Sequence, residues 1–263
     1  MNANAATAIT TGQRDQTAKR QPPKKVNKSD IQPRKMDFQF DPAMPRYWFD
    51  NDQFKTMLLT ALSCTFPEGE RFFVRSVRHF QKNLTDPLLR EQVKGFIGQE
   101  AHHGNEHDAF NAFMESKGVP TGKVDAYVKD GLKFMAKWLS PERQLAKTCA
   151  LEHFTAMMAE VTLEDGSIFD GTHEDILRLW QWHALEETEH KAVAFDVFQQ
   201  VTQTWTPRQR YFLRLKVMMI VTLLFTSNIS RYAAKLLVAD GMGPWTARAR
   251  VLGYLLFKPG LFR

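Results

Sequence analysis

Apolar side chains recur every three or four residues along most of the chain, a spacing that places them on one face of an α-helix. One such stripe begins at Phe54, Met57 and Leu58 and continues at Phe73 and Val77. No segment alternates apolar and polar residues convincingly over the length of a strand. The pattern therefore predicts an all-α protein.

The stripes and their end signals divide the chain into successive helices. Asp86 followed by Pro87 is typical of a helix start, and Thr172 is expected to cap a later helix. Pro67 and Gly69 predict a kink inside the first helix, because proline removes a backbone hydrogen bond. The predicted helices span residues 51–84, 87–117, 124–139, 141–164 and 172–203. Four of them are long and the third is a linking helix, which is the pattern of a four-helix bundle.

Charge is distributed unevenly along the chain. The net charge is +6 over residues 1–35, −9 over residues 36–207 and +9 over residues 208–263. The first segment is polar and lacks apolar periodicity, so it cannot bury enough surface to order itself. We therefore predict a disordered basic tail over 1–36, a helical bundle over 37–207 and a basic, apolar helical extension over 208–263. The aromatic residues are not interleaved with the basic ones, so no specific nucleic-acid partner is expected.

The C-terminal extension combines basic residues with a short apolar run. The run from Val217 to Phe225 is interrupted only by Thr222 and is short for a membrane span, which needs about 20 apolar residues. Arg208 and Lys216 are among the basic residues just before it. Three hypotheses remain open: an interfacial helix on an anionic membrane through residues 208–235, a helix packed on the bundle, and a true span.

The cysteines and the N-terminal sequence indicate the cellular compartment in which the protein is expected. Cys64 and Cys149 are the two cysteines, and each falls in a predicted apolar helix. Two buried thiols fit a reducing compartment better than a disulfide does. The N-terminus lacks the apolar stretch of a signal peptide. We expect a cytoplasmic protein, with membrane association left open and a homodimer as the default assembly.

Two Glu-x-x-His motifs carry the candidate chemistry. They are Glu100 with His103 and Glu187 with His190. Residues three apart lie on one helix face, so each pair can aim at one point. Burying several carboxylates together without cations would be costly, and two metal ions remove that cost.

One further glutamate is expected from each of the two other long helices. Glu70 and Glu152 share apolar stripes and precede the motifs at similar distances, which favours them over the rival residues Glu68 and Glu160. Together with the motifs they complete the six-ligand pattern of di-iron and di-manganese carboxylate bundles.

Several histidines accompany this set. His183 lies one turn before Glu187 on the same face, so it is either a third imidazole ligand or a neighbour that bonds a ligand. We interpret His107 as such a neighbour. The remaining histidines are expected to be ordinary: His79, His102 and His153. The predicted metal ligands are Glu70, Glu100, His103, Glu152, His183, Glu187 and His190.

The arrangement over residues 50–205 resembles the ferritin-like di-iron carboxylate superfamily. The strings Pro-Glu-Gly-Glu-Arg-Phe-Phe at 67–73, Gly-Gln-Glu-Ala-His-His at 98–103 and Glu-Glu-Thr-Glu-His-Lys at 186–191 are similar to a bacterial family labelled predicted metal-dependent hydrolases. His183 is similar to the third histidine of the arylamine N-oxygenases of that superfamily. The resemblance implies a ferritin-like bundle with a metal centre and a small-molecule substrate.

Three functions follow from such a centre. The first is an oxidase or oxygenase that uses two iron ions, with manganese as an alternative, to oxidise an organic substrate with O2. The second is a metal-dependent hydrolase with a metal-activated water. The third is metal storage without catalysis, which the basic ends of the chain argue against weakly.

Overall fold

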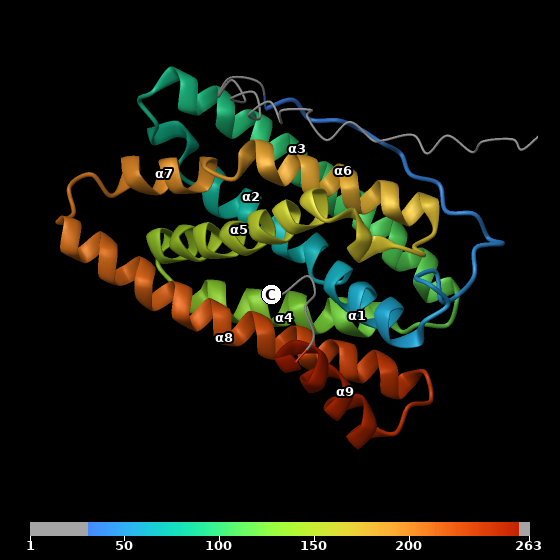
Figure 1. Ribbon diagram of the computed structural model, residues 1–263. Helices are drawn as coiled ribbons and strands as arrows, with labels where there is room; N and C mark the ends of the chain where they lie inside the picture. Colours follow the sequence, from blue (N-terminus) through green and yellow to red (C-terminus); the bar gives the residue numbers. More distant parts are fainter. Residues whose placement is uncertain (1–30, 258–263) are drawn as a thin grey trace, which may run out of the picture.

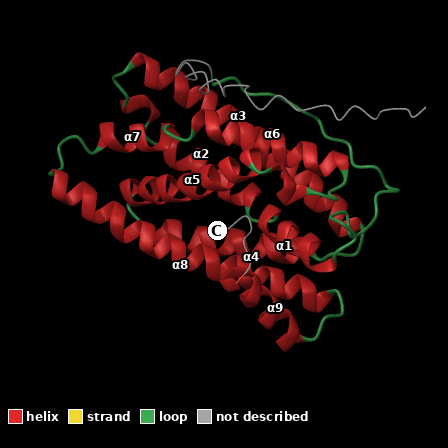
Figure 2. Ribbon diagram, viewed as in Figure 1, coloured by secondary structure: helices red, strands yellow, loops and turns green. Residues whose placement is uncertain are grey.

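The computed structural model describes residues 31–257, which are mostly helical from Gln53 onward and non-helical before it, with one isolated β-bridge between Phe49 and Thr172 (Figures 1 and 2). The all-α prediction is confirmed for this part of the chain. The α-helices are α1 (Gln53–Ser63), α2 (Phe66–Arg78), α3 (Pro87–Ser116), α4 (Thr121–Trp138), α5 (Pro141–Glu164), α6 (Glu174–His190), α7 (Val193–Val201), α8 (Pro207–Ala239) and α9 (Pro244–Phe257). Short 3-10 helices, η1 (Gln81–Asn83) and η2 (Gly166–Phe169), follow α2 and α5.

The helices α2, α3, α5 and α6 enclose a common interior. α2 packs along α3, α5 packs along α6, and the two pairs meet where α2 touches α5 and α3 touches α6. α4, the predicted linking helix, lies against α2 and α3, and α8 packs across α1 and α5. The assignment of this arrangement to a ferritin-like bundle stays a prediction.

The first predicted helix, residues 51–84, is two helices. The chain breaks at Cys64 and Thr65 and not at the expected kink near Pro67 and Gly69. Pro67 lies in the first turn of α2, where its missing N–H costs nothing because that position has no intrahelical acceptor. The proline therefore begins a helix here and does not bend one.

The last predicted helix of the bundle, residues 172–203, is also divided. His173, and not Thr172, is its N-cap, and its ring nitrogen accepts a hydrogen bond from the backbone N–H of Asp175. The helix ends at His190, and α7 begins at Val193. The apolar periodicity continues across the break, which is why the sequence alone did not reveal it.

An N-terminal strap, residues 31–40, runs along α3 and α6 (Figure 1). The prediction of a disordered tail up to residue 36 is wrong for residues 31–36, while residues 1–30 lie outside the described part. Ile31 is buried, and the backbone N–H groups of Asp37 and Phe38 donate to the carboxylate of Glu106. Sequence periodicity missed the strap because an extended segment needs only a few anchors.

Two glycines of α3 allow the strap to approach the helix backbone. A Cβ added at Gly95 would lie 2.4 Å from the carbonyl oxygen of Ile31, and one at Gly98 would lie 2.4 Å from the ring of Pro33. Neither separation is tolerated by real side chains, so these positions require glycine for the strap to stay in place.

We expect Gly95→Ala to destabilise the protein by about 1–3 kcal/mol, the usual cost of overpacking. The matched control is Gly253→Ala in α9, where an added Cβ meets nothing within 4 Å. The control should gain up to about 1 kcal/mol, because alanine favours helix over glycine. Thermal unfolding measures both changes, and equal shifts in the two variants would contradict the packing of the strap.

The outer face of α8 is unusually apolar for a surface helix. By length and composition α8 could cross a membrane, but only 11% of its most apolar window is buried in the protein. Exposed apolar residues on this helix include Phe212, Met219 and Leu223. Its inner face, with Ile229, Ala233 and Leu236, packs into the core. This finding permits membrane association of α8 without establishing it.

Candidate metal centre

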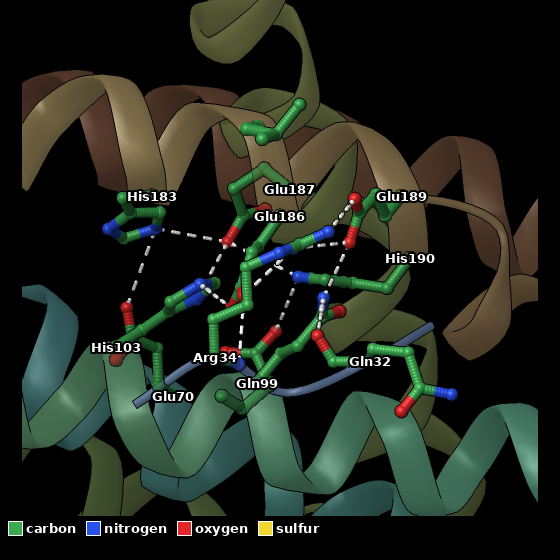
Figure 3. A network of polar contacts seen from close by, with 12 residues as sticks. Gln32, Arg34, Glu70, Gln99, His103, His183, Glu186, Glu187, Glu189 and His190 are labelled. Carbon is green, nitrogen blue, oxygen red and sulfur yellow. Dashed lines mark hydrogen bonds and ion pairs between the residues drawn. The ribbon is translucent and has the colours of Figure 1, made fainter. Parts of the chain in front are cut away.

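The side chains predicted to bind metal converge in the interior enclosed by α2, α3, α5 and α6 (Figure 3). α3 and α6 each contribute a glutamate and a histidine three residues apart, as helical geometry requires for a shared face. All the predicted ligands are buried: Glu70 from α2, Glu100 and His103 from α3, Glu152 from α5, and His183, Glu187 and His190 from α6.

Glu187 lies nearest the centre of the cluster. Its Oε1 is 3.0 Å from His183 Nε2, 3.6 Å from His103 Nδ1 and 3.7 Å from His190 Nε2. A single carboxylate therefore faces three imidazoles from two helices. The carboxylate of Glu187 is thus surrounded by the imidazoles of the cluster.

The two flanking carboxylates approach different histidines. Glu70 Oε1 lies 3.7 Å from His183 Nε2, and Glu152 Oε2 lies 3.3 Å from His190 Nδ1. Gly104 of α3 provides the room for Glu70, since an added Cβ would lie 3.2 Å from its Oε2. α2 and α5 thus bring one carboxylate to each end of the cluster.

Two overlapping groups have the composition and spacing of metal sites. Glu100, His103, Glu187 and His190 form one, and Glu70, His103 and His183 form the other, each with ligand atoms within 4.8 Å of one another. His103 belongs to both groups. Carboxylate and imidazole donors together suit divalent iron, manganese or zinc.

The donor atoms fit cations because the protein leaves them without partners. Buried atoms with no hydrogen-bond partner include both oxygens of Glu70, Glu100 and Glu152, and both ring nitrogens of His190. Leaving this many buried polar atoms unpaired is costly and rare in native proteins. Ions at this place would satisfy them, so the residues present match a metal centre.

Burial and repulsion between carboxylates shift the pKa values of the glutamates and histidines in the cluster. Burial, with added repulsion from neighbouring carboxylates, raises the pKa of Glu70 and of Glu100 well above the usual value. The pKa of Glu152 rises to about 7, chiefly through burial. Burial lowers the pKa of His103, so this imidazole is neutral at pH 7 and able to donate a lone pair.

A hydrogen-bond chain orients His183. Asn111 Nδ2 donates to the backbone carbonyl of Ser63, so its Oδ1 accepts from the Ser63 hydroxyl at 2.8 Å. The hydroxyl must then accept from His107 Nδ1, which lies 2.8 Å away. Neutral His107 therefore uses Nε2 as an acceptor for His183 Nδ1–H at 2.7 Å.

This chain decides which lone pair His183 presents to the cluster. When Nδ1 carries the only ring hydrogen, Nε2 of His183 turns a lone pair toward Glu187 Oε1, which lies 3.0 Å away. Two lone pairs at this distance repel each other unless a cation lies between them. With that tautomer Nε2 of His183 is available to a cation, and its assignment as a ligand stays a prediction. His107 holds it in place and contacts no carboxylate of the cluster, in line with its predicted supporting role.

The rival carboxylates lie elsewhere. Glu68 is directed at Arg71, with 2.9 Å between Oε1 and Nη1, and Glu160 is exposed. Of the histidines expected to be ordinary, His79 and His153 are exposed and His102 is half-buried. None of these side chains belongs to the groups that could hold a metal ion in the described part of the chain.

A second layer of polar residues was missed by the sequence analysis. Glu186 Oε2 lies 3.1 Å from His103 Nε2, and Oε1 accepts from both the backbone N–H and Nη1 of Arg34. Arg34 also pairs with both oxygens of Glu189, to which Gln99 Nε2 donates at 2.7 Å (Figure 3). The sequence analysis gave Glu186 and Glu189 no role, and Arg34 lay in the segment predicted to be disordered.

Comparison with known proteins identifies a family model that matches most of the chain. A family model described as predicted metal-dependent hydrolase matches residues 32–263, which include the strap, the helices that hold the cluster, α8 and α9. No curated protein and no solved structure matches the chain.

Proposed function

Because the chain belongs to the family of predicted metal-dependent hydrolases, we propose that it is a hydrolase whose activity requires two divalent metal ions. The observation that carries this proposal is the cluster of buried carboxylates and imidazoles without hydrogen-bond partners. We assign the ions to Glu70, Glu100, His103, Glu152, His183, Glu187 and His190. Glu187 would contact both ions, since it faces histidines of both groups.

We also propose that α2, α3, α5 and α6 form a ferritin-like four-helix bundle, with α4 as the linking helix and α8 and α9 as the extension. Two facing helices that each carry Glu-x-x-His, and two others that each carry one glutamate, are the ligand arrangement of such bundles. The contacts of α2 with α3 and of α5 with α6 support this assignment.

When bound, two divalent ions supply an activated water and a positive charge that stabilises the leaving group. The protein positions the groups that hold them. Glu186 fixes the ring of His103 through Nε2, and Arg34 holds Glu186 in turn. The ring of Trp182 packs edge-on against His103 with 4.9 Å between centroids, and Phe96 packs likewise against His190 at 5.0 Å. These aromatic contacts exclude water from the flanks and restrict the imidazoles.

Oxidation of an organic substrate by O2 is a second candidate, favoured by the donor set. Four glutamates and two or three histidines are the pattern of di-iron and di-manganese carboxylate proteins. Carboxylates are hard donors suited to iron and manganese. Under this hypothesis the cofactor is a pair of iron ions, with manganese as the alternative, and O2 is a co-substrate.

One experiment separates the candidates. The purified chain is loaded anaerobically with Fe(II), Mn(II) or Zn(II) and given p-nitrophenyl esters and a p-nitrophenyl phosphodiester. A hydrolase will release p-nitrophenol without O2, and Glu100→Gln will slow this release at least about a hundredfold through loss of metal. The matched control, Glu160→Gln, changes an exposed carboxylate of α5 and should match the wild type.

Other outcomes overturn the hydrolase assignment. Absence of hydrolysis together with O2 consumption and a new visible absorption band in the Fe(II) protein would replace it by the oxidase. Uptake of many iron ions per chain without turnover would replace it by metal storage.

A further inference from the structure

A large apolar cavity lies beside the metal centre. It has a volume of about 640 Å³ and is enclosed by α2, α4, α5 and α8. Apolar side chains such as Phe73, Leu132, Leu151 and Phe225 form most of its wall. The volume is within the range of about 300–1,000 Å³ that small-molecule sites occupy.

The cavity reaches the candidate metal ligands directly. Glu70, whose two oxygens have no hydrogen-bond partner, lines it. Phe66 and Thr155 line both this cavity and a smaller one of about 20 Å³ that touches His183 and Glu187. A molecule held in the large cavity would therefore have one part against the metal centre.

Lys147 is the less exposed of two cationic side chains that line the cavity; the other, Arg231 of α8, is exposed and donates to Asn228 Oδ1 at 3.1 Å. Lys147 of α5 lines the cavity, and burial lowers the pKa of its amine to about 8. Its Nζ lies 2.9 Å from the sulfur of Met135 and 5.4 Å from the ring centroid of Phe72. No ion pair to Lys147 occurs within the described residues 31–257. An amine so placed gains from an anionic partner, which none of the described residues supplies.

The rim of the cavity is apolar and faces outward. Phe134 and Trp138 of α4 and Leu224 of α8 line the cavity and are also exposed, the first two by 69% and 67%. Met219 and Leu223 of α8, which do not line the cavity, are exposed too. Surfaces of this kind mark contacts with membranes or other apolar partners.

Charge on the same helix favours a membrane as that partner. The exposed Arg208 and Lys216 lie in the first part of α8. Basic residues beside an exposed apolar helix face are attracted to anionic lipid surfaces. Aromatic side chains such as Trp138 commonly lie at the level of the headgroups.

We propose that this cavity is the substrate site and that it takes a single-chain amphiphile with an anionic head group, drawn from a membrane on which α8 lies. The apolar wall buries the hydrocarbon chain, and Lys147 pairs with the head group. This proposal rests on the proposed function, because it names the class of substrate delivered to the metal centre.

Equilibrium binding tests the cavity without any turnover. The metal-loaded full chain is titrated with the fluorescent fatty acid cis-parinaric acid, which is then displaced by palmitate or by hexadecanol. We expect saturable binding of one molecule per chain. Lys147→Met should weaken palmitate binding at least about tenfold, equivalent to about 1.4 kcal/mol, and leave hexadecanol binding unchanged.

Two controls make this test specific. Lys133→Met removes an exposed amine from α4 and should leave both ligands unaffected. Gly131→Leu adds a side chain to the cavity wall at a position where a Cβ meets nothing within 4 Å, and it should weaken both ligands. Absence of saturable binding, or equal losses of both ligands in Lys147→Met, would overturn the proposal.

Vesicle flotation tests the membrane as the source. We expect the protein to float with vesicles of phosphatidylcholine and phosphatidylglycerol, and less with phosphatidylcholine alone. The double variant Met219→Glu, Leu223→Glu should remain in the soluble fraction. Binding of palmitate without flotation would overturn the membrane part and leave a soluble amphiphile as the ligand. Metal content and hydrolysis of short p-nitrophenyl esters, measured in parallel, distinguish a failed cavity from a failed hydrolase.

Discussion

The Glu187→Gln variant will bind divalent metal ions at least about a hundredfold more weakly than the wild-type protein. Glu187 Oε1 faces His183, His103 and His190 within 3.7 Å, so no other carboxylate contacts as many histidines of the centre. An amide has nearly the same shape but lacks the charge that attracts a cation. Metal content after dialysis, measured by inductively coupled plasma mass spectrometry, will report the loss.

Glu160→Gln is the matched control for this change. It removes the same charge from an exposed position of α5 and should retain the wild-type metal content. Circular dichroism of both variants will check that the helices are intact. Equal metal content in the two variants would refute the assignment of Glu187 to the centre.

Removal of metal will lower the unfolding temperature by about 8–16 °C. Ligand present at about a thousand times its Kd stabilises a protein by about 4 kcal/mol, and each kcal/mol shifts the unfolding temperature of a chain this size by about 2–4 °C. The buried carboxylates of the cluster are the reason, since without ions they must either repel one another or take up protons. Calorimetry with and without a chelator measures the shift.

The chelated protein will also lose stability as pH rises from about 7 to about 9. Burial raises the pKa of Glu70 and Glu100, and that of Glu152 to about 7. Although burial opposes it, the carboxylates of Glu187 and Glu152 raise the pKa of His190 to about 9. These groups keep protons in the folded state that the unfolded chain has already released. The folded state therefore binds more protons than the unfolded state over this range. Its free energy of unfolding falls as the pH rises and these protons are lost.

Metal ions replace those protons, so the loaded protein should show no such decline over the same pH range. Unfolding temperatures of the loaded and chelated forms, measured in parallel buffers, test this difference. A chelated protein whose stability rises over this range would contradict the pKa shifts, and one that unfolds at the same temperature as the loaded form would contradict the metal centre.

The sequence was most informative where the spacing of residues along a helix shows which side chains share one buried face. Glu100 with His103 and Glu187 with His190 could be placed on common faces because three residues make nearly one turn. The same period identified Glu70 and Glu152 by their apolar neighbours, and the structure brings all these side chains into one interior. It also predicted helix boundaries well where a cap residue precedes a proline, as at Asp86.

Other features could not be predicted because they depend on contacts between distant segments. Arg34 lies in a polar stretch, and only the fold places it against Glu186 and Glu189, 152 and 155 residues away. The break after His190 has no proline or glycine to mark it. The cavity beside Glu70 is formed by four helices. The distances between these helices cannot be read from the sequence of any one of them.

The amide of Asn111 has a consequence for tuning the centre. Its orientation, set by a backbone carbonyl at the end of α1, is passed through Ser63 and His107 to the ring of His183. Replacing Asn111 by leucine would free the serine hydroxyl to donate to His107, which would move the ring hydrogen of His183 from Nδ1 to Nε2, the nitrogen that faces Glu187. A residue that is not among the proposed ligands can thus decide whether the ring nitrogen of His183 beside Glu187 is free to bind a metal ion.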